Sequence, residues 1–393
     1  MNGVEAGRVG TRLREHEDRL IGFIEGARWN GPPSDESFGD LALRTFALQC
    51  DAIPAYGDYA RYLGHGPDRV RSWREIPAVP ASAFKTHDLN AAPWRDIAGG
   101  GAAGGSDAGG AVIFETSGTS ISRPGRVRLE STRLYEASLA KSFWEHLLPD
   151  DARLAAAVLG PTRAAAPRSS LWFMVDRIVA AFCEGGAWAV VGGEPNWDWV
   201  DAALERACLG QRPLLLLGTT LLFQAYFERC DRKGIRFLLP RGSRAMDTGG
   251  AKGARVELTR GDVEGAFARV LGVPASHLVN EYGMAEMGSQ FYDDTLLAAH
   301  QGRPAKPGKR IPPWVRTRVF DPETMLPRGE EASGVLVHYD LANLEAPMAI
   351  QTEDLGACRG DRLLLEGRLP EAERRGCSLP FDQFLERERA RGA

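Results

Sequence analysis

The segment Phe114-Glu-Thr-Ser-Gly-Thr-Ser-Ile-Ser-Arg-Pro-Gly-Arg126 links an apolar run to an amphipathic one. Residues 111–114 predict a short strand, and residues 131–148 predict a helix because apolar side chains recur every three or four positions. Gly118 allows the intervening backbone to approach a ligand closely. Backbone N–H groups and hydroxyls in such a loop can converge on one anion, so we interpret it as a polyphosphate-binding turn; the alternative is a solvated Ser/Thr turn. It is not a common P-loop, because Gly-Lys-Ser/Thr is missing. The residues expected to face the phosphates are Thr116, Ser117, Gly118, Thr119 and Ser120.

A second segment, residues 277–290, predicts a strand that runs into a turn at Gly283 and presents Glu281, Tyr282 and Glu286. A flat aromatic ring beside a glycine turn can stack on a base or an acyl group. A carboxylate next to it can hold Mg²⁺ beside phosphates. We therefore expect Glu286 to hold the metal ion. The residues assigned here to nucleotide binding are Tyr282, Gly283 and Met284.

A third segment contains Asp354, before Gly356, and is followed by Arg368. An aspartate at a buried edge can accept a hydrogen bond from a ribose hydroxyl, and an arginine can donate to ribose or phosphate. The alternatives are a turn residue for Asp354 and a surface ion pair for Arg368.

The composition and charge of the chain limit which classes of protein it can belong to. The chain has 393 residues, a net charge of −4 and 44% hydrophobic residues, as in ordinary globular proteins. Because no long basic stripe occurs, nucleic acid is not expected as a partner. The apolar stretches 171–183 and 213–223 are too short to span a bilayer, and residues 1–14 lack the apolar core of a signal peptide. The six cysteines show no CxxC pairing, so we expect reduced thiols in a cytoplasmic protein.

Strand and helix patterns alternate from residue 111 to residue 286, which predicts a layered α/β fold with mainly parallel strands and flanking helices. Ligands in such sheets bind at the carboxyl ends of strands. We expect a helical N-terminal region and α/β body over residues 1–302, then a small β-rich subdomain and tail over residues 303–393. In the body, strands are expected at residues 152–159, 187–191, 213–217, 236–239 and 277–280, and helices at 170–183, 197–209, 221–233 and 260–271. The later strands are expected at residues 316–321, 334–339 and 362–366.

The order of these motifs resembles that of adenylate-forming enzymes, which include acyl-CoA synthetases, firefly-type luciferases and adenylation domains. Thr-Ser-Gly-Thr, Tyr-Gly-Met-Ala-Glu, Thr-Glu-Asp and Gly-Arg follow one another as in that superfamily. Residues 76–89, Phe46-Ala-Leu-Gln-Cys50 and residues 375–379 are similar to LuxE-type acyl-protein synthetases. The resemblance covers residues 38–379. It implies the N-terminal-domain fold of the superfamily, with ATP and Mg²⁺ as cofactors and a carboxylic acid as substrate.

The sequence departs from the broad superfamily at its end and in its phosphate loop. Only 25 residues follow Arg368, so we expect no separate mobile C-terminal domain with its catalytic lysine. Some other cation must then stabilise the transition state at the α-phosphorus. Lys85 and Lys252 are the candidates, each with a surface charge as its alternative. The loop also lacks its usual lysine, and Arg123, Arg126 and Arg128 are the candidates to replace it. Gly249 and Gly250 resemble the segment that packs against adenine.

Cys377 matches the C-terminal cysteine that receives the acyl group in LuxE-type proteins. It follows Glu373-Arg-Arg-Gly376, and two guanidinium groups there would favour its thiolate. The alternative is an inert buried cysteine.

Three functions are compatible with these residues. The first is ATP-dependent activation of a carboxylic acid, by resemblance a fatty acid, to acyl-AMP, with transfer to Cys377 and then to a partner such as an acyl reductase or carrier protein. The second is an adenylating ligase for an aryl or other biosynthetic acid that uses no self-acylated cysteine. The third is a degenerate nucleotide-binding or scaffold protein. The identity of the acid and of the final acceptor does not follow from the sequence.

Overall fold

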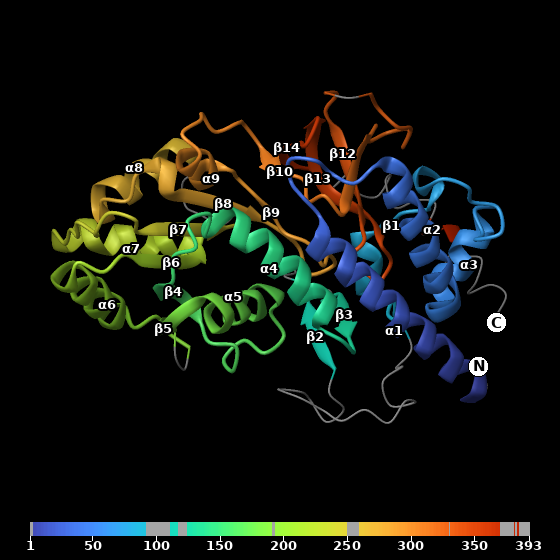
Figure 1. Cartoon of the computed structure of the whole chain (residues 1–393), viewed down its shortest axis with the longest axis horizontal. Helices are drawn as coiled ribbons and strands as arrows, with labels where there is room; N and C mark the ends of the chain where they lie inside the picture. Colours follow the sequence, from blue (N-terminus) through green and yellow to red (C-terminus); the bar gives the residue numbers. More distant parts are fainter. Residues whose placement is uncertain are drawn as a thin grey trace. The chain divides into compact units, whose positions relative to one another are not determined.

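The computed structural model describes residues 3–91, 111–116, 124–190, 193–249, 259–329, 331–369, 381, 383 and 384 (Figure 1). The chain divides into two compact units, each assembled from separate stretches of sequence. Unit 1 consists of Met1–Leu139, Met284–Ser289 and Ile311–Ala393, and unit 2 of Ala140–Gly283 and Gln290–Arg310. The helix α4 (Arg133–Leu147) takes the chain from unit 1 into unit 2.

Unit 2 is the α/β body. Its strands lie in the order β10-β9-β8-β7-β6-β4-β5, and β4 to β8 pair in parallel, whereas β9 pairs antiparallel with both neighbours. Buried apolar side chains from β4 and β6 pack with those of α6, α7 and α8. The strands are β4 (Leu154–Pro161), β5 (Cys183–Val190), β6 (Leu214–Thr219), β7 (Arg244–Thr248), β8 (Leu278–Tyr282), β9 (Phe291–Tyr292) and β10 (Lys309–Arg310).

The helices of the body begin where the sequence provides a capping side chain. Asn196 caps α6, Thr219 caps α7 and Thr259 caps α8, each accepting a backbone N–H bond in the first turn. Left-handed glycines end two of them, Gly234 at φ +66° and Gly272 at φ +68°. The four helices expected from the sequence therefore match those of the structure within one residue. They are α5 (Ser170–Phe182), α6 (Trp197–Gly210), α7 (Thr220–Lys233) and α8 (Arg260–Leu271); η3 (Ala275–His277) and α9 (Thr295–His300) follow.

One strand prediction is wrong. Residues 236–239 do not join the sheet, because the Phe237 and Leu239 amides donate to the carbonyls of Val270 and Leu271 at 2.8 and 3.1 Å. The strand that joins the sheet after α7 is instead β7. It was not expected because three of its five residues, in the sequence Arg-Ala-Met-Asp-Thr, are polar.

Two ion pairs compensate the buried charges of β7, each with a partner that is about one third exposed. Arg244 Nη1 lies 2.7 Å from Asp150 Oδ1, and Asp247 Oδ1 lies 2.7 Å from Arg260 Nη1. Each charge is therefore compensated, which a buried strand requires. The periodicity of apolar residues gives no sign of such partners.

Unit 1 contains the three strands expected after residue 303, together with a strand over Ala349–Arg359 that was not expected, and these four strands pair antiparallel. They lie in the order β11-β12-β13-β14, and β1 pairs in parallel with β13. These strands are β1 (Val79–Pro80), β11 (Val315–Phe320), β12 (Gly334–Asp340), β13 (Ala349–Arg359) and β14 (Arg362–Arg368). A separate hairpin is formed by β2 (Val112–Glu115) and β3 (Arg126–Leu129).

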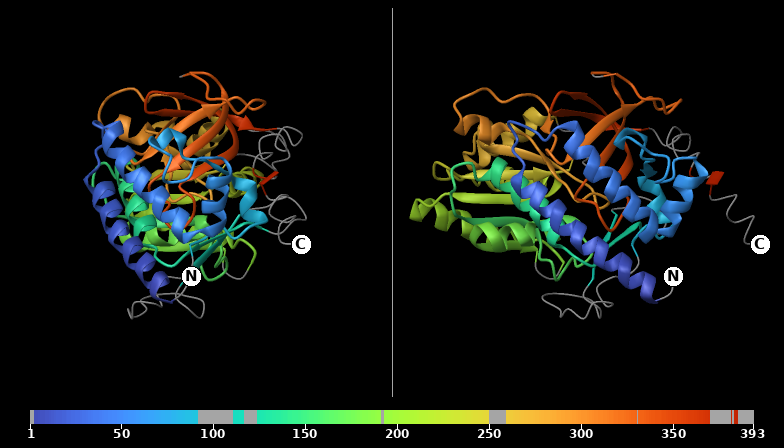
Figure 2. Two further views of the ribbon diagram at one scale, coloured as in Figure 1. Left: turned by 90° about the vertical axis from the view of Figure 1, so that its right-hand side faces the viewer. Right: turned by 45° about the vertical axis from the view of Figure 1, so that its right-hand side comes forward.

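The helices of unit 1 come from the N-terminal part of the chain. They are α1 (Gly3–Gly26), α2 (Asp35–Ala52), α3 (Pro54–Tyr62), η1 (Trp73–Glu75) and η2 (Ala81–Lys85). The long α1 packs against α2 (Figure 2), and a buried hydrogen bond of 2.8 Å joins His16 to Thr45 between them. None of the helices in the described part of the chain combines the length and apolar character needed to cross a bilayer.

Gln49 on α2 joins the N-terminal helices to the loop before β13. Its side-chain amide donates to the carbonyls of Asn343, Leu344 and Ala346 at 2.9, 3.1 and 2.5 Å, and its oxygen accepts the Met348 N–H at 3.0 Å. The side chain is fully buried, so it satisfies four backbone groups that have no access to water.

We predict that Gln49→Leu lowers the free energy of unfolding by about 3 kcal/mol or more. The substitution leaves several buried polar groups without hydrogen-bond partners, and each such loss costs roughly 1–3 kcal/mol. Denaturant unfolding measures the loss. The control is Gln224→Leu, which removes only a bond to the side chain of Glu228. Equal losses in both variants would contradict the role of Gln49.

Candidate functional site

The ends of the predicted phosphate loop are closed by the β2–β3 hairpin of unit 1. The Thr116 N–H donates to the Gly125 carbonyl, and the Gly125 N–H donates to Thr116 Oγ1, both at 2.9 Å. Thr116 therefore holds the base of the loop. The other loop residues assigned to phosphate binding lie outside the described residues; they are Ser117, Gly118, Thr119 and Ser120.

Two of the arginines proposed to replace the loop lysine have partners within unit 1. Arg126 forms an ion pair with Glu115 across the hairpin at 3.1 Å, and the Arg128 guanidinium donates to the Ala91 carbonyl. Arg123 lies outside the described residues.

Pairing between β1 and β13 positions Lys85. Val79 and Pro80 pair with Ile350 and Gln351, and η2 follows β1 directly, so Lys85 lies at its last residue. Immediately before it, Phe84 touches the base of the loop: a Cβ added to Gly125 would lie 3.1 Å from the Phe84 carbonyl carbon. The partly buried Lys85 is therefore brought beside the phosphate hairpin.

Glu286 lies in the same unit, within electrostatic range of Lys85 and Arg368. Its side chain is buried, and burial raises its pKa to about 7, while the charges of Lys85 and Arg368 oppose that rise. Glu353 adds a smaller increase. The Asn343 side-chain amide donates to the Glu286 carbonyl at 2.8 Å and so holds the backbone of the motif. The structure thus places Lys85 and Arg368 within electrostatic range of Glu286, although the three residues come from distant parts of the sequence.

Asp354 is not a turn residue, contrary to the alternative considered from the sequence. It lies within β13, where Arg368 of β14 is its register partner, and Arg368 Nε lies 2.8 Å from Asp354 Oδ1. The carboxylate is mostly buried, whereas the Arg368 side chain is 51% exposed. A ribose hydroxyl bound here would share the carboxylate with Arg368.

Asp340 anchors the motif after Gly283 and was not expected from the sequence. It lies at the end of β12 and accepts hydrogen bonds from the Gly288 N–H at 3.1 Å and from Ser289 Oγ at 2.7 Å. Burial raises the pKa of Asp340 to about 6. An aspartate that ends an apolar strand was the available signal, because a buried carboxylate needs hydrogen-bond partners.

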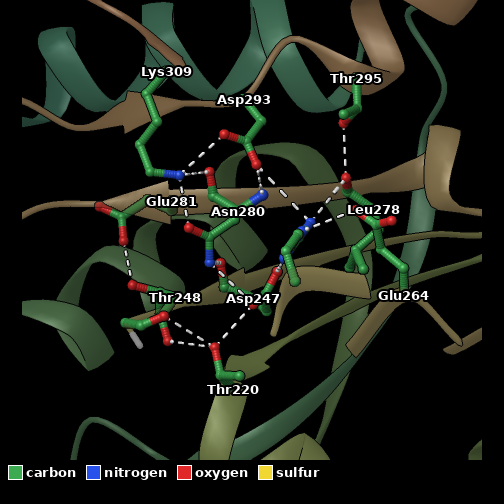
Figure 3. A network of polar contacts seen from close by, with 12 residues as sticks. Thr220, Asp247, Thr248, Glu264, Leu278, Asn280, Glu281, Asp293, Thr295 and Lys309 are labelled. Carbon is green, nitrogen blue, oxygen red and sulfur yellow. Dashed lines mark hydrogen bonds and ion pairs between the residues drawn. The ribbon is translucent and has the colours of Figure 1, made fainter. Parts of the chain in front are cut away.

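Unit 2 contains two glycine turns at the ends of neighbouring parallel strands, next to Thr248 and Glu281, which Figure 3 labels. Thr248 of β7 is the register partner of Glu281 of β8, so Gly249 and the Tyr282-Gly283 pair follow at the same end of the sheet. Gly249 has φ +76°, a conformation that favours glycine. Gly250 and Lys252 lie outside the described residues.

The protein side of a magnesium site would consist of Glu286. Among the described residues, no group of three or more His, Cys, Asp or Glu side chains could hold a metal ion. A single buried carboxylate nevertheless fits Mg²⁺, which commonly binds one or two carboxylates together with substrate phosphates and water.

A pocket in unit 1 lies between the hairpin and the motif that contains Glu286. Phe114, Val127, Leu134 and Met287 give it an apolar wall, and Ala285 places it one residue from Glu286. Two carboxylates also border it, and both already have partners within the unit. Glu345 accepts N–H bonds from Glu130 and Ser131, and Glu17 pairs with Arg133.

Comparison with known proteins decides the family. A family model described as acyl-protein synthetase, LuxE, matches residues 74–386, most of the chain. The chain belongs to the LuxE family. This match confirms the resemblance that the motifs indicated, and it spans Lys85, Glu286, Asp354, Arg368 and Cys377.

Two bacterial relatives of this LuxE-family chain match over most of their length. Both are long-chain-fatty-acid–luciferin-component ligases. That of Aliivibrio fischeri is 20% identical over 388 residues, or 94% of each chain. That of Vibrio harveyi is 23% identical over 341 residues, or 84% of this chain and 82% of the relative.

Solved structures confirm the fold class. An open conformation of 2-hydroxyisobutyryl-CoA ligase, in complex with 2-HIB-AMP and CoA, superposes with a TM-score of 0.57 and 15% identity. The match covers 88% of this chain and 81% of that one. The LuxE-family chain therefore has the α/β fold of adenylate-forming enzymes, with a partly parallel sheet and antiparallel C-terminal strands.

Asp354→Asn tests the ribose assignment. We predict that the wild type binds ATP about tenfold more tightly than 2′-deoxy-ATP, and that the variant loses most of this preference, because a charged acceptor is worth roughly 1.5–3 kcal/mol. The melting temperature should change little, since an ion pair with an exposed partner contributes little. Binding titrations with both nucleotides give the ratio, and Asp58→Asn, in an exposed ion pair with Arg61, is the control. An unchanged ratio in Asp354→Asn would remove Asp354 from the ribose site.

Proposed function

We propose that the protein is an ATP-dependent acid–protein ligase that activates a carboxylic acid, of the fatty-acid class, as acyl-AMP. The observation that supports it most directly is the convergence of Lys85, Glu286 and Arg368 beside the base of the phosphate hairpin. Membership of the LuxE family and the names of the two bacterial relatives support a fatty acid as the substrate class.

The first half-reaction joins the acid to AMP. A carboxylate oxygen attacks the α-phosphorus of ATP, the bond to the β-phosphate breaks, and pyrophosphate leaves with the electron pair. Negative charge develops on the oxygens around the α-phosphorus, where the Lys85 ammonium would stabilise it. Mg²⁺, which enters with ATP, would offset phosphate charge while bound to Glu286. Arg368 and Asp354 would hold the ribose.

In the second half-reaction the Cys377 thiolate attacks the acyl carbonyl and AMP leaves, so that a thioester replaces the mixed anhydride. Cys377 lies outside the described residues, and its assignment rests on the family resemblance and on Arg374 and Arg375 beside it. Two other cysteines are poor nucleophiles, since burial raises the pKa of Cys50 to about 12 and that of Cys183 to about 11. An acyl reductase or a carrier protein would then accept the acyl group.

The pocket between the hairpin and Ala285 is our candidate for the apolar part of the acid. Much of its wall is apolar, and Glu17 and Glu345, which border it, are paired within the unit. Ala285 in the wall is next to Glu286, so the carboxyl end of the acid would lie near the phosphates. An aryl-acid ligase, the alternative, could line a pocket with Trp172, Trp197 and Trp199, but these three side chains lie in different surroundings. Trp172 covers Gly160, Trp197 packs on Tyr226, and Trp199 is half exposed.

ATP–pyrophosphate exchange with a series of aliphatic and aryl acids tests adenylation. We predict that exchange is strongest with a long aliphatic acid, and that Lys85→Met and Glu286→Gln each lower it by about 10²-fold or more, because each removes charge stabilisation from the transition state. Lys233→Met, an exposed lysine at the end of α7, is the control and should match the wild type. Exchange driven by aryl acids alone would favour the alternative ligase. Absence of exchange with every acid tested would favour a scaffold protein.

Cys377→Ser tests acyl transfer separately from adenylation. With ATP, Mg²⁺ and the preferred acid, the wild type should form a hydroxylamine-labile adduct that peptide mass spectrometry locates on Cys377. The serine variant should still make acyl-AMP but not the adduct, because a serine hydroxyl is scarcely ionised at neutral pH. Cys208→Ser, at a partly buried position, is the matched control. Full product formation without any adduct would support the ligase that lacks a self-acylated cysteine.

A further inference from the structure

Glu281 is a buried acid at the point where the two glycine turns of unit 2 leave the sheet. One carboxyl oxygen, Oε2, accepts a hydrogen bond from the Thr248 hydroxyl, and Thr248 immediately precedes Gly249 (Figure 3). The other oxygen, Oε1, lies 2.5 Å from the place that a Cβ on Gly283 would occupy. One carboxyl group is therefore in contact with both turns.

The charged side chains around Glu281 form hydrogen bonds and ion pairs mainly with other residues. Lys309 on β10 donates to the Asn280 carbonyl at 2.9 Å and to Asn280 Oδ1 at 2.6 Å, and it pairs with Asp293 at 3.1 Å. Asp247 on β7 pairs with Arg260, which in turn lies 3.9 Å from Asp293.

A further neighbour of Glu281 in the sheet is a tyrosine. Tyr292 of β9 is the register partner of Glu281, and its ring stacks on His146 at 5.4 Å between centroids. Burial is the largest influence on Glu281 and raises its pKa to about 7; the Thr248 hydrogen bond and Lys309 lower it, and Asp247 raises it.

We propose that Glu281 is a positioning residue for the nucleotide site, whose carboxyl holds the Thr248-Gly249 and Tyr282-Gly283 turns in one arrangement and whose protonation is coupled to nucleotide binding. This inference rests on the proposed function, since it assumes that these turns bind ATP. It adds a residue that neither contacts the reacting atoms nor holds the metal ion.

The coupling has a physical direction. A neutral Glu281 joins the two turns without placing a charge in the interior, whereas an ionised Glu281 places a negative charge directly beneath them. An anionic nucleotide bound at the turns therefore favours the protonated form. By linkage, nucleotide binding takes up a proton at Glu281, and affinity falls as Glu281 ionises.

Stability of the unliganded protein tests the buried titration first. The pKa of Glu281 is the ordinary 4.5 in the unfolded chain and about 7 in the folded one. Between these two pH values the folded state therefore keeps a proton on Glu281 that the unfolded state has lost. The stability that Glu281 contributes is therefore present below pH 4.5, declines as the pH rises to 7, and is constant above it. We expect the melting temperature of Glu281→Gln, relative to that of the wild type, to rise between pH 5 and about 7. Glu228→Gln, on the surface of α7, should show no such gain.

Calorimetric titration with MgATP then tests the coupling. At pH 7, in two buffers of different ionisation enthalpy, the wild type should take up more protons than Glu281→Gln. Between pH 6 and 8 the wild-type Kd should rise several-fold relative to that of the variant. Comparison of the two proteins cancels the proton that the nucleotide itself exchanges. Equal proton uptake and parallel pH profiles would overturn the inference while leaving the nucleotide site intact, whereas a wild type that binds no nucleotide would overturn the proposed function and the inference with it.

Thr248 provides a second test in case Glu281→Gln does not fold. Thr248→Val removes the hydrogen bond that favours the ionised carboxylate, so the midpoint of the pH dependence of Kd should move upward. Thr248→Ser keeps the hydroxyl and should keep the wild-type midpoint. An unchanged midpoint in Thr248→Val would show that the Thr248–Glu281 contact does not control the titration.

Discussion

Backbone pairing along β13 is the constraint on which the catalytic part of unit 1 depends. Two residues of β1 pair with it in parallel, and this short contact fixes where η2, and therefore Lys85, must lie. On its other side β13 pairs with β14, which places Arg368 opposite Asp354. Side chains separated by more than 250 positions in the sequence thus become neighbours through main-chain hydrogen bonds. These bonds are made by the backbone and not by the side chains that they bring close.

Buried polar side chains hold the irregular segments in place. Gln49 satisfies four backbone groups of the loop before β13, and Asp340 holds the backbone and the serine that follow Glu286. Glu345 does the same for the chain after β3. In each case a loop that cannot satisfy its own N–H or carbonyl groups takes partners from a distant element. The described segments around Glu286 and before β13 are therefore held by buried hydrogen bonds, and a precise transition-state geometry requires such support.

The α/β body shows where sequence patterns suffice and where they fail. Four helices follow from apolar periodicity and from capping residues such as Thr219 and Thr259, because both signals are local. The strand β7 was missed because Arg244 and Asp247 interrupt its apolar pattern. Their partners, Asp150 and Arg260, lie at distances along the chain that periodicity does not report.

The sequence by itself determined the family, the α/β class and the identity of most candidate site residues, because these follow from ordered local motifs and from the alternation of strands and helices. Only the tertiary structure decided that Lys85 lies with Glu286 and Arg368, that Asp354 is within a strand and paired, and that Glu281 joins two turns. The reason is physical. Strand register, burial and the electrostatic field at a carboxyl group arise from elements that meet only when the chain is folded, and no local pattern encodes them.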